Sequence, residues 1–255
     1  MAVKLSHCAA DGTGRFFTRL HRSVSENVKD FGLPPTALEF AVWFDGHFDH
    51  DVADLEVLDV GCGLNAYNAR HASKRGCRRV CAVDLNPDAA ANLRAVCPEI
   101  EVAEGSLLDI PHPDQSLDFV ICSGAVHHAP DPEKALAEIH RILRPGGKAY
   151  ISMYSFLGSP FEYIVRVWRF IGLFVPYSLA HSLFNRFPAI NNYVLDHTYV
   201  PILWLFGRDE IVDLLRRVGF AVIDDWPNRV DPFQRYGLTK FISGGGLVRV
   251  FLVSK

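Results

Sequence analysis

The sequence predicts an α/β protein built on a doubly wound, mostly parallel sheet of seven strands. Three observations support this fold class. Short apolar runs alternate with segments of helical periodicity over residues 56–154, a glycine-containing loop follows the first run, and two more apolar runs end the chain. Such alternation is typical of parallel strands joined by helical crossovers.

The helices are marked by their caps and by their spacing. Asp131 is a natural N-cap, Pro132 suits the first helical position, and apolar residues recur at helical spacing up to residue 142. The Arg-Pro-Gly-Gly stretch that follows predicts a turn into the next strand. Helices are expected at 66–74, 87–96, 131–143 and 208–219, and strands at 56–60, 79–84, 100–105, 117–123, 148–154, 221–226 and 244–254.

Two further segments flank or interrupt this core. We expect a core of residues 51–155 and 207–255, an N-terminal helical segment (1–50) covering the ligand edge of the sheet, and a helical cap insertion (156–206). The insertion holds 13 of the 30 aromatic residues but only five charged ones. It could fill its own core, wall a pocket for an apolar substrate, or lie on a membrane surface with Arg166 and Arg169 toward the headgroups.

Composition limits the function classes. A formal net charge of −3 and a pI near 6.4 argue against nucleic acid as a partner. The N-terminus lacks the apolar core of a signal peptide, so we expect a cytoplasmic protein. Six cysteines without a C-x-x-C pair indicate neither a disulfide framework nor a metal site.

The stretch LDVGCGLNA, residues 58–66, predicts a nucleotide-like ligand but fits two cofactors. Gly61 and Gly63 allow a tight turn and a close approach of the backbone, and Asp84 can accept hydrogen bonds from ribose hydroxyls. These features suit a dinucleotide or S-adenosylmethionine. Asp59 favours the second, because a carboxylate can receive a cationic amine but would repel a pyrophosphate.

In their order and spacing, VLDVGCG, VDLNP and EGSLLDIPHPDQSLDFVICSGAVHHAPDPEKALAEIHRILRPGG resemble the class I S-adenosylmethionine-dependent methyltransferases. The sequence is most similar to the small-molecule branch, which includes quinone-biosynthesis and natural-product enzymes. The resemblance covers residues 56–154 strongly and 207–255 loosely. It implies the Rossmann-like methyltransferase fold and S-adenosyl-L-methionine as cofactor.

The resemblance also implies which residues bind that cofactor. The methionine end would lie on Asp59, Gly61, Cys62 and Gly63, the ribose on Asp84, the adenine on Leu85, Ser106 and Leu107, and the methyl group near Ser123.

The sequence departs from the family pattern at two positions. Asn65 stands where a third glycine is usual, and we expect asparagine to preserve the turn because it tolerates positive φ. Ser106 stands where an aspartate often binds the adenine amino group. Asp109, three residues further on, could replace it.

Methyl transfer needs an aligned acceptor and, for some acceptors, a base. His127 and His128 follow the fourth core strand, and Tyr154 ends the fifth. Asp196 and His197 are adjacent polar residues in the apolar insertion, where they would either anchor the cap or contact substrate. These five are the candidate catalytic residues; Asp231 and Arg235 are weaker candidates.

The leading hypothesis is methyl transfer to oxygen, nitrogen or carbon of a small, largely apolar molecule. The alternatives are a cofactor-binding sensor or partner subunit without catalysis, and a nicotinamide-dependent oxidoreductase based on the G-x-G-x-x-A match alone. A small lipophilic substrate is the expected partner, with membrane contact as an open alternative. The sequence makes no prediction of oligomeric state.

Overall fold

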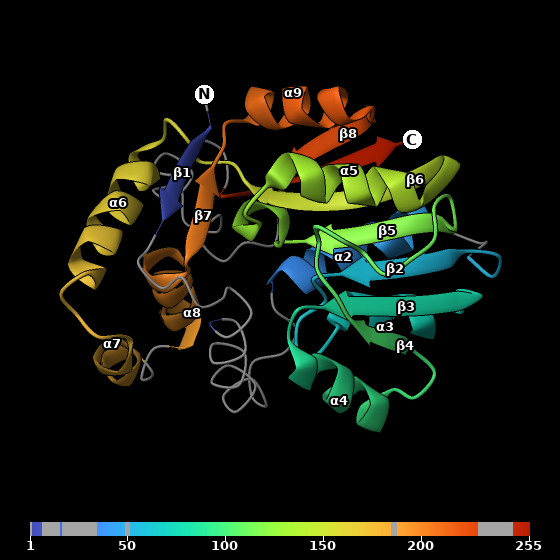
Figure 1. Ribbon diagram of the computed structural model, residues 1–255, viewed down its shortest axis with the longest axis horizontal. Helices are drawn as coiled ribbons and strands as arrows, with labels where there is room; N and C mark the ends of the chain where they lie inside the picture. Colours follow the sequence, from blue (N-terminus) through green and yellow to red (C-terminus); the bar gives the residue numbers. More distant parts are fainter. Residues whose placement is uncertain (1, 7–15, 17–34, 49–51, 185–187, 229–246) are drawn as a thin grey trace.

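A seven-stranded sheet between two layers of helices forms the body of the protein, and a separate group of helices stands beyond one edge of it (Figure 1). The structure is a computed structural model and describes residues 2–6, 16, 35–48, 52–184, 188–228 and 247–255. Most of the expected N-terminal segment, and the weaker candidates Asp231 and Arg235, lie outside these ranges.

The strand order in the large sheet is β4-β3-β2-β5-β6-β9-β8. Parallel pairing joins β4, β3, β2, β5 and β6, whereas β9 runs antiparallel to both of its neighbours. The predicted seven-stranded, mostly parallel sheet is confirmed. The strands are β2 (Glu56–Val60), β3 (Arg79–Asp84), β4 (Glu101–Glu104), β5 (Leu117–Ser123), β6 (Leu143–Tyr154), β8 (Ala221–Pro227) and β9 (Val248–Ser254).

The two faces of the sheet are covered by different helices. Alternate strand residues point to opposite faces, so Leu58 and Val60 pack under α5 (Pro132–Ile142) and α9 (Arg208–Val218). Val57 and Phe119 lie on the other face, under α2 (Pro35–His47), α3 (Tyr67–Lys74) and α4 (Pro87–Val96). Two separate apolar cores hold the strands in register.

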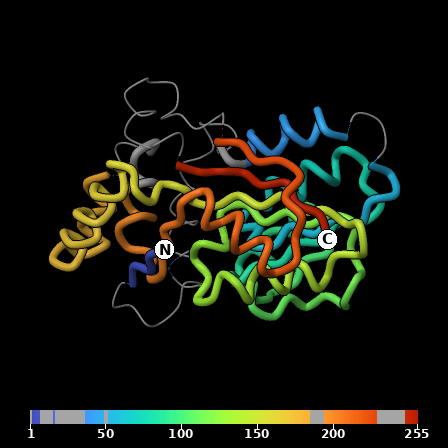
Figure 2. The backbone as a smooth tube through the Cα atoms, turned by 90° about the horizontal axis from the view of Figure 1, so that it is seen from above, coloured from blue at the N-terminus to red at the C-terminus, as the bar shows by residue number. Residues whose placement is uncertain are grey.

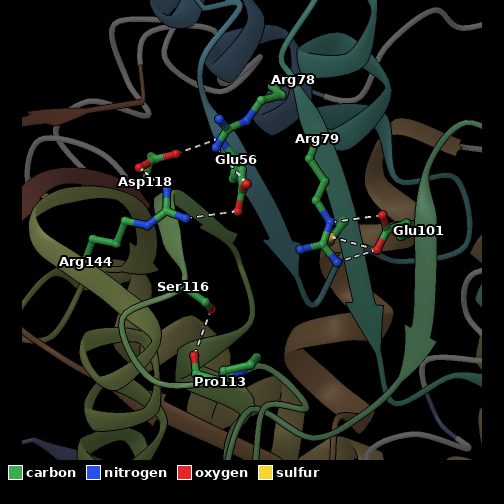
Figure 3. A network of polar contacts seen from close by, with 9 residues as sticks. Glu56, Arg78, Arg79, Glu101, Pro113, Ser116, Asp118 and Arg144 are labelled. Carbon is green, nitrogen blue, oxygen red and sulfur yellow. Dashed lines mark hydrogen bonds and ion pairs between the residues drawn. The ribbon is translucent and has the colours of Figure 1, made fainter.

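Ion pairs tie the strands together at their amino ends (Figure 3). Glu56 of β2 pairs with Arg78 and with Arg144 of β6, and Arg144 also pairs with Asp118 of β5. The carboxylate of Asp118 in turn accepts from the backbone N–H of Glu56 at 2.8 Å. This edge is occupied by its own network, which leaves the carboxyl edge for ligands, as is usual in open α/β sheets.

The segment between β6 and α9 holds three helices and a strand. These are α6 (Pro160–Gly172), α7 (Tyr177–Phe184), α8 (Pro188–Tyr199) and β7 (Ile202–Leu205). The strand β7 was not expected. It pairs antiparallel with β1 (Val3–Ser6) in a small second sheet, so the beginning of the chain adds a strand, not a helix, to the cap. No helix within the described ranges has the length and hydropathy needed to cross a bilayer.

Two details differ from the sequence-based expectation. Helix α2 packs on the face of the sheet, where Phe40 contacts Tyr150 at 5.2 Å between ring centroids, and not on the ligand edge. Strand β6 begins at Leu143, before the expected turn, because Leu143 already pairs with Leu117. Gly146, with φ of 79°, accommodates the irregular stretch that follows.

Candidate functional site

The glycine loop, residues 61–66, follows β2 at the carboxyl edge of the sheet and is anchored to the end of β3. The backbone N–H of Gly61 donates to Val83 O at 2.8 Å, and that of Gly63 donates to Asp84 Oδ2 at 2.7 Å. Both glycines have positive φ, 72° and 66°. The loop therefore takes a shape that L side chains adopt only with strain.

Gly61 meets a second requirement for glycine. A Cβ at this position would lie 2.6 Å from the Cβ of Ala125, in the loop after β5. The backbone at Gly61 thus lies against the Ala125 side chain, and a side chain at residue 61 would push the two loops apart.

The expected role of Asn65 is wrong. The residue with positive φ is the next one, Ala66, at 39° and ψ of 51°, where it precedes the first turn of α3. The third glycine of the family pattern is therefore replaced by a strained alanine one position later. Ala66 is fully buried, and packing in the core beneath α3 opposes the strain.

Asp84 is held by backbone donors on both carboxylate oxygens. Besides the Gly63 contact, its Oδ1 accepts from Asn86 N at 2.8 Å, and the Asn86 side chain caps α4 by accepting from Asp88 N at 3.0 Å. A carboxylate oxygen has two lone pairs, so each retains acceptor capacity. Asp84 is thus fixed in orientation and can still bind hydroxyl groups.

Asp59 is almost fully buried just before the loop. Its Oδ2 accepts from Ala69 N in α3 at 3.1 Å. Burial raises the pKa of Asp59 to about 7, and the charge of Asp84 adds to the shift. A cation next to this carboxyl would lower its pKa again, which makes Asp59 responsive to a bound amine.

The remaining predicted cofactor residues line the same edge. Burial raises the pKa of the Cys62 thiol, so it stays protonated at neutral pH. Ser106 Oγ accepts from Leu108 N at 3.1 Å and so shapes its own loop. Leu85 is exposed, and Ser123 Oγ lies 3.0 Å from Ser152 Oγ of β6. Ser152, which shares a face of β6 with Tyr154, was missed by sequence reasoning, because it stands inside an apolar run.

The five candidate catalytic residues come together in one cluster, here called the histidine–tyrosine cluster: His127, His128, Tyr154, Asp196 and His197. Tyr154 is central, since its ring lies 3.9 Å from that of His127 and stacks on His197 at 4.7 Å between centroids. Its hydroxyl donates to Asp196 Oδ2 at 2.6 Å. The residues come from the short helix Val126–His128, the end of β6 and helix α8.

The hydrogen bonds of His128 fix which of its nitrogens is basic. Its Nδ1 lies 3.0 Å from the carbonyl oxygen of Ile202, and because a carbonyl only accepts, Nδ1 carries the proton. The basic nitrogen is then Nε2, which faces Asp196 Oδ1 at 3.7 Å. Burial lowers the pKa of His128 while Asp196 opposes the shift, so the imidazole is neutral at pH 7.

His127 is fully buried, with its pKa held well below the ordinary value by burial and by the neighbouring histidines. Its Nδ1 accepts from Tyr154 N at 3.3 Å, which leaves the proton on Nε2. That N–H has no hydrogen-bond partner among the described residues, and neither has Asp196 Oδ1. Buried polar atoms without partners are uncommon and often mark a site that binds something.

Arg169 holds the cap behind this cluster. It is only 6% exposed and donates to three carbonyl oxygens, those of His197, Val200 and Leu5. Burial lowers the pKa of Arg169 to about 10. The alternative in which Arg169 faces membrane headgroups is therefore wrong for this residue, because its guanidinium donates to backbone carbonyl groups at the end of α8 and in β1.

Comparisons with known proteins agree with this geometry. A family model described as a methyltransferase domain matches residues 58–151. A probable S-adenosylmethionine-dependent methyltransferase of Mycolicibacterium smegmatis is 32% identical over 46% of this chain and 48% of its own. The demethylmenaquinone methyltransferase of Chlorobaculum parvum is 36% identical over 38% of this chain and 39% of its own length. The chain thus spans about half or less of the length of these two relatives.

A solved structure extends the likeness to the whole fold. It is the 1,6-didemethyltoxoflavin-N1-methyltransferase of Burkholderia thailandensis, with bound 1,6-didemethyltoxoflavin and S-adenosylhomocysteine. The match covers 100% of this chain and 96% of that one, with a TM-score of 0.59 and 17% identity. At this identity the likeness concerns the fold alone. The chain therefore contains a methyltransferase domain, matched over residues 58–151, and has the fold of the class I S-adenosylmethionine-dependent methyltransferases.

Proposed function

We propose that this protein transfers the methyl group of S-adenosylmethionine to a small, largely apolar acceptor. The observation that carries the proposal is the meeting of two sites at one sheet edge. The glycine loop after β2 touches the loop after β5 at Ala125, and the histidine–tyrosine cluster begins two residues later. A cofactor on the first loop and an acceptor beside the cluster would be close enough for direct transfer.

The cofactor, when bound, supplies a methyl group already activated on a positively charged sulfur. Asp84 would receive the ribose hydroxyls on oxygens that the Gly63 and Asn86 N–H groups keep oriented. Asp59 would receive the amine, directly or through the backbone donors that it fixes. Leu85, Ser106, Leu107 and Ser123 keep the roles that the family resemblance implies.

Residues of the histidine–tyrosine cluster would orient the acceptor and take up its proton. Asp196 is positioned by the Tyr154 hydroxyl, and its Oδ1 faces the basic nitrogen of His128. A proton released by an acceptor hydroxyl could be held at His128 Nε2 and stabilised there by the Asp196 carboxylate. His127 packs against Tyr154 and would act as a positioning residue.

The surroundings of the cluster favour an apolar acceptor. Phe156 and Phe161 contact His197 at 5.7 and 5.6 Å between ring centroids. Around them is an apolar group that includes Val165 and Leu203. A site with such walls and few polar groups selects for size and apolarity more than for charge. Quinone-type molecules fit this description. The Chlorobaculum parvum relative is named a demethylmenaquinone methyltransferase, which is consistent with such an acceptor.

Calorimetric titration with S-adenosylmethionine, S-adenosylhomocysteine and NAD tests the cofactor assignment. We expect micromolar binding of the first two and none of NAD. Asp84→Ala should weaken binding by at least about tenfold, because hydrogen bonds to a carboxylate contribute about 1.5–3 kcal/mol. Glu99→Ala removes one exposed carboxylate from the opposite end of the sheet and should leave the affinity unchanged.

A panel of quinols, phenols, fatty acids and amines then tests turnover. Methylation of at least one lipophilic member is the expected result. Tight cofactor binding with no product across the panel would favour the alternative of a sensor or partner subunit. Equal cofactor affinity in the Asp84 variant and the unaltered protein would refute the site itself.

A further inference from the structure

Helix α6 buries two of its three charged side chains and exposes several large apolar ones. Its buried face is formed by Glu162, Val165, Arg169 and Gly172, with the two charged residues only 7% and 6% exposed. On a helix at the surface of a water-soluble protein the opposite pattern is normal. The outward face of α6 is therefore adapted to something other than water.

That face is large and continuous along the helix. Tyr163, Val167, Phe170 and Phe174 follow one another at spacings of three or four residues, so they lie on one side of the helix and the turn after it. Phe170 is 63% and Phe174 73% exposed, and their rings contact each other at 5.4 Å. With their exposed neighbours they form what we call the outer apolar face: Tyr163, Val167, Phe170, Ile171, Leu173, Phe174, Leu179 and Leu183.

The outer apolar face carries almost no charge. Across residues 160–184, all of which the structure describes, Arg166 is the only exposed charged side chain. It is already neutralised by Glu162, at 2.7 Å. Glu162 also accepts from Gly158 N, so it is held in place at the start of the helix. The surface thus offers no net charge, and its exposed hydrogen-bonding side chains are Arg166, already paired with Glu162, the Tyr163 hydroxyl and two serines of α7.

We propose that the outer apolar face of α6 and α7 inserts into the outer acyl region of a lipid bilayer. Figures 1 and 2 both place α6 and α7 at the end of the molecule farthest from the seven-stranded sheet. Acyl chains require no hydrogen bonds, whereas a protein partner of this size would offer polar groups that need several. Aromatic side chains are also favoured at the depth where headgroups meet acyl chains.

The position of the face also fits the proposed function, although the proposal does not depend on it. Phe161, from the same helix, reaches inward to His197 of the histidine–tyrosine cluster. An apolar acceptor dissolved in a membrane would therefore meet α6 before it meets the cluster. Vesicle binding needs no turnover, so failure of either proposal can be recognised separately.

Flotation of the full chain with phosphatidylcholine vesicles tests the proposal. Because the face is uncharged and the chain has a net charge of −3, binding should occur on neutral vesicles and persist in high salt. The triple variant Val167→Ser, Phe170→Ser and Phe174→Ser should lower the partition coefficient by at least about a hundredfold. Unaltered protein that stays unbound, or a variant that floats equally well, would overturn the proposal.

A matched control separates this face from general surface hydrophobicity. Val42, Val96 and Ile223 are also at least half exposed but lie elsewhere on the molecule, and changing all three to Ser should leave flotation intact. Both variants should keep the unaltered unfolding temperature and S-adenosylhomocysteine affinity. If the serine variant of the outer face unfolds, the single change Phe174→Glu, in the turn after α6, replaces it and should abolish flotation.

Light scattering on the protein without vesicles decides between a bilayer and a second copy of the chain. A monomer that floats supports the bilayer. A dimer that the outer-face variant converts to a monomer would identify the face as an interface between copies and would overturn the proposal.

Discussion

The glycine loop and the histidine–tyrosine cluster share one edge of the sheet but are built by different means. In the loop, backbone shape and backbone N–H groups make the contacts, and the anchoring residues lie in consecutive strands. In the cluster, side chains from three distant segments meet, and the cap must be in place before they do. Under the proposed function, cofactor binding would therefore depend on the core fold, and acceptor recognition would depend on the cap.

The largest effect is expected for a change in the glycine loop, where backbone shape makes the contacts. Gly61→Ala adds a Cβ that meets Ala125 at 2.6 Å, at a residue whose φ is 72°. Strain and overpacking together should lower the free energy of unfolding by about 3 kcal/mol and weaken S-adenosylhomocysteine binding by about a hundredfold. Denaturant unfolding and calorimetry measure the two effects.

Gly76→Ala is the matched control for this change. Gly76 also has positive φ, 88°, but a Cβ there meets nothing within 4 Å. The Gly76→Ala variant should lose only about 1 kcal/mol of unfolding free energy, because of backbone strain, and should keep its cofactor affinity. If the two alanine variants lose affinity equally, the contact between the two loops is not what shapes the cofactor site.

An intermediate effect is expected for a change in the histidine–tyrosine cluster. Tyr154→Phe removes the hydroxyl that positions Asp196 and should lower kcat by about tenfold to a hundredfold with cofactor affinity unchanged. Tyr199→Phe removes a hydroxyl bonded to Val175 O at 2.8 Å in the same cap, and should change kcat by less than about twofold. Similar losses of kcat in both variants would mean that Tyr154 only stabilises the cap.

The smallest effect concerns the buried carboxyl of Asp59. With its pKa raised to about 7, the folded protein binds a proton between about pH 4 and pH 7 that the unfolded chain has released. Stability from this group therefore falls as pH rises through that window. The free energy of unfolding of Asp59→Asn should rise by about 2 kcal/mol relative to that of the unaltered protein as the pH is raised from 5 to 7.5. Denaturant unfolding at the two pH values measures this change.

Asp118→Asn provides the contrast. Burial raises the pKa of Asp118, but the hydrogen bond from Glu56 N and the contacts with Arg144 together outweigh it, so the net shift is downward and this carboxylate is charged at both pH values. Its loss should destabilise the protein equally at pH 5 and pH 7.5. Parallel pH curves for Asp59→Asn and the unaltered protein would show that Asp59 is ionised throughout.

The difference between local backbone contacts and contacts between distant segments also explains how much of the structure could be predicted from the sequence. The core strands, Gly61, Gly63 and Asp84 were predictable because each depends on neighbours in sequence or on a repeated period. Sequence reasoning also selected the five members of the cluster. His127, His128 and Tyr154 were chosen for their position at the ends of core strands, and Asp196 and His197 for their polarity in an apolar insertion. It could not predict that Arg169 turns inward or that Ala66 takes the strained φ, because both depend on packing between segments far apart in the chain.

The pairing of β1 with β7 has a consequence for the order in which the protein folds. Val3 and Leu205 are paired although about 200 residues separate them, and Arg169 donates a hydrogen bond to Leu5, which is 164 residues away in the sequence. Contacts over such separations form late, because a long loop must close before they contribute. During synthesis β1 cannot pair until β7, about 200 residues later in the chain, has been made. In mature molecules we expect this small sheet to open before the core sheet does.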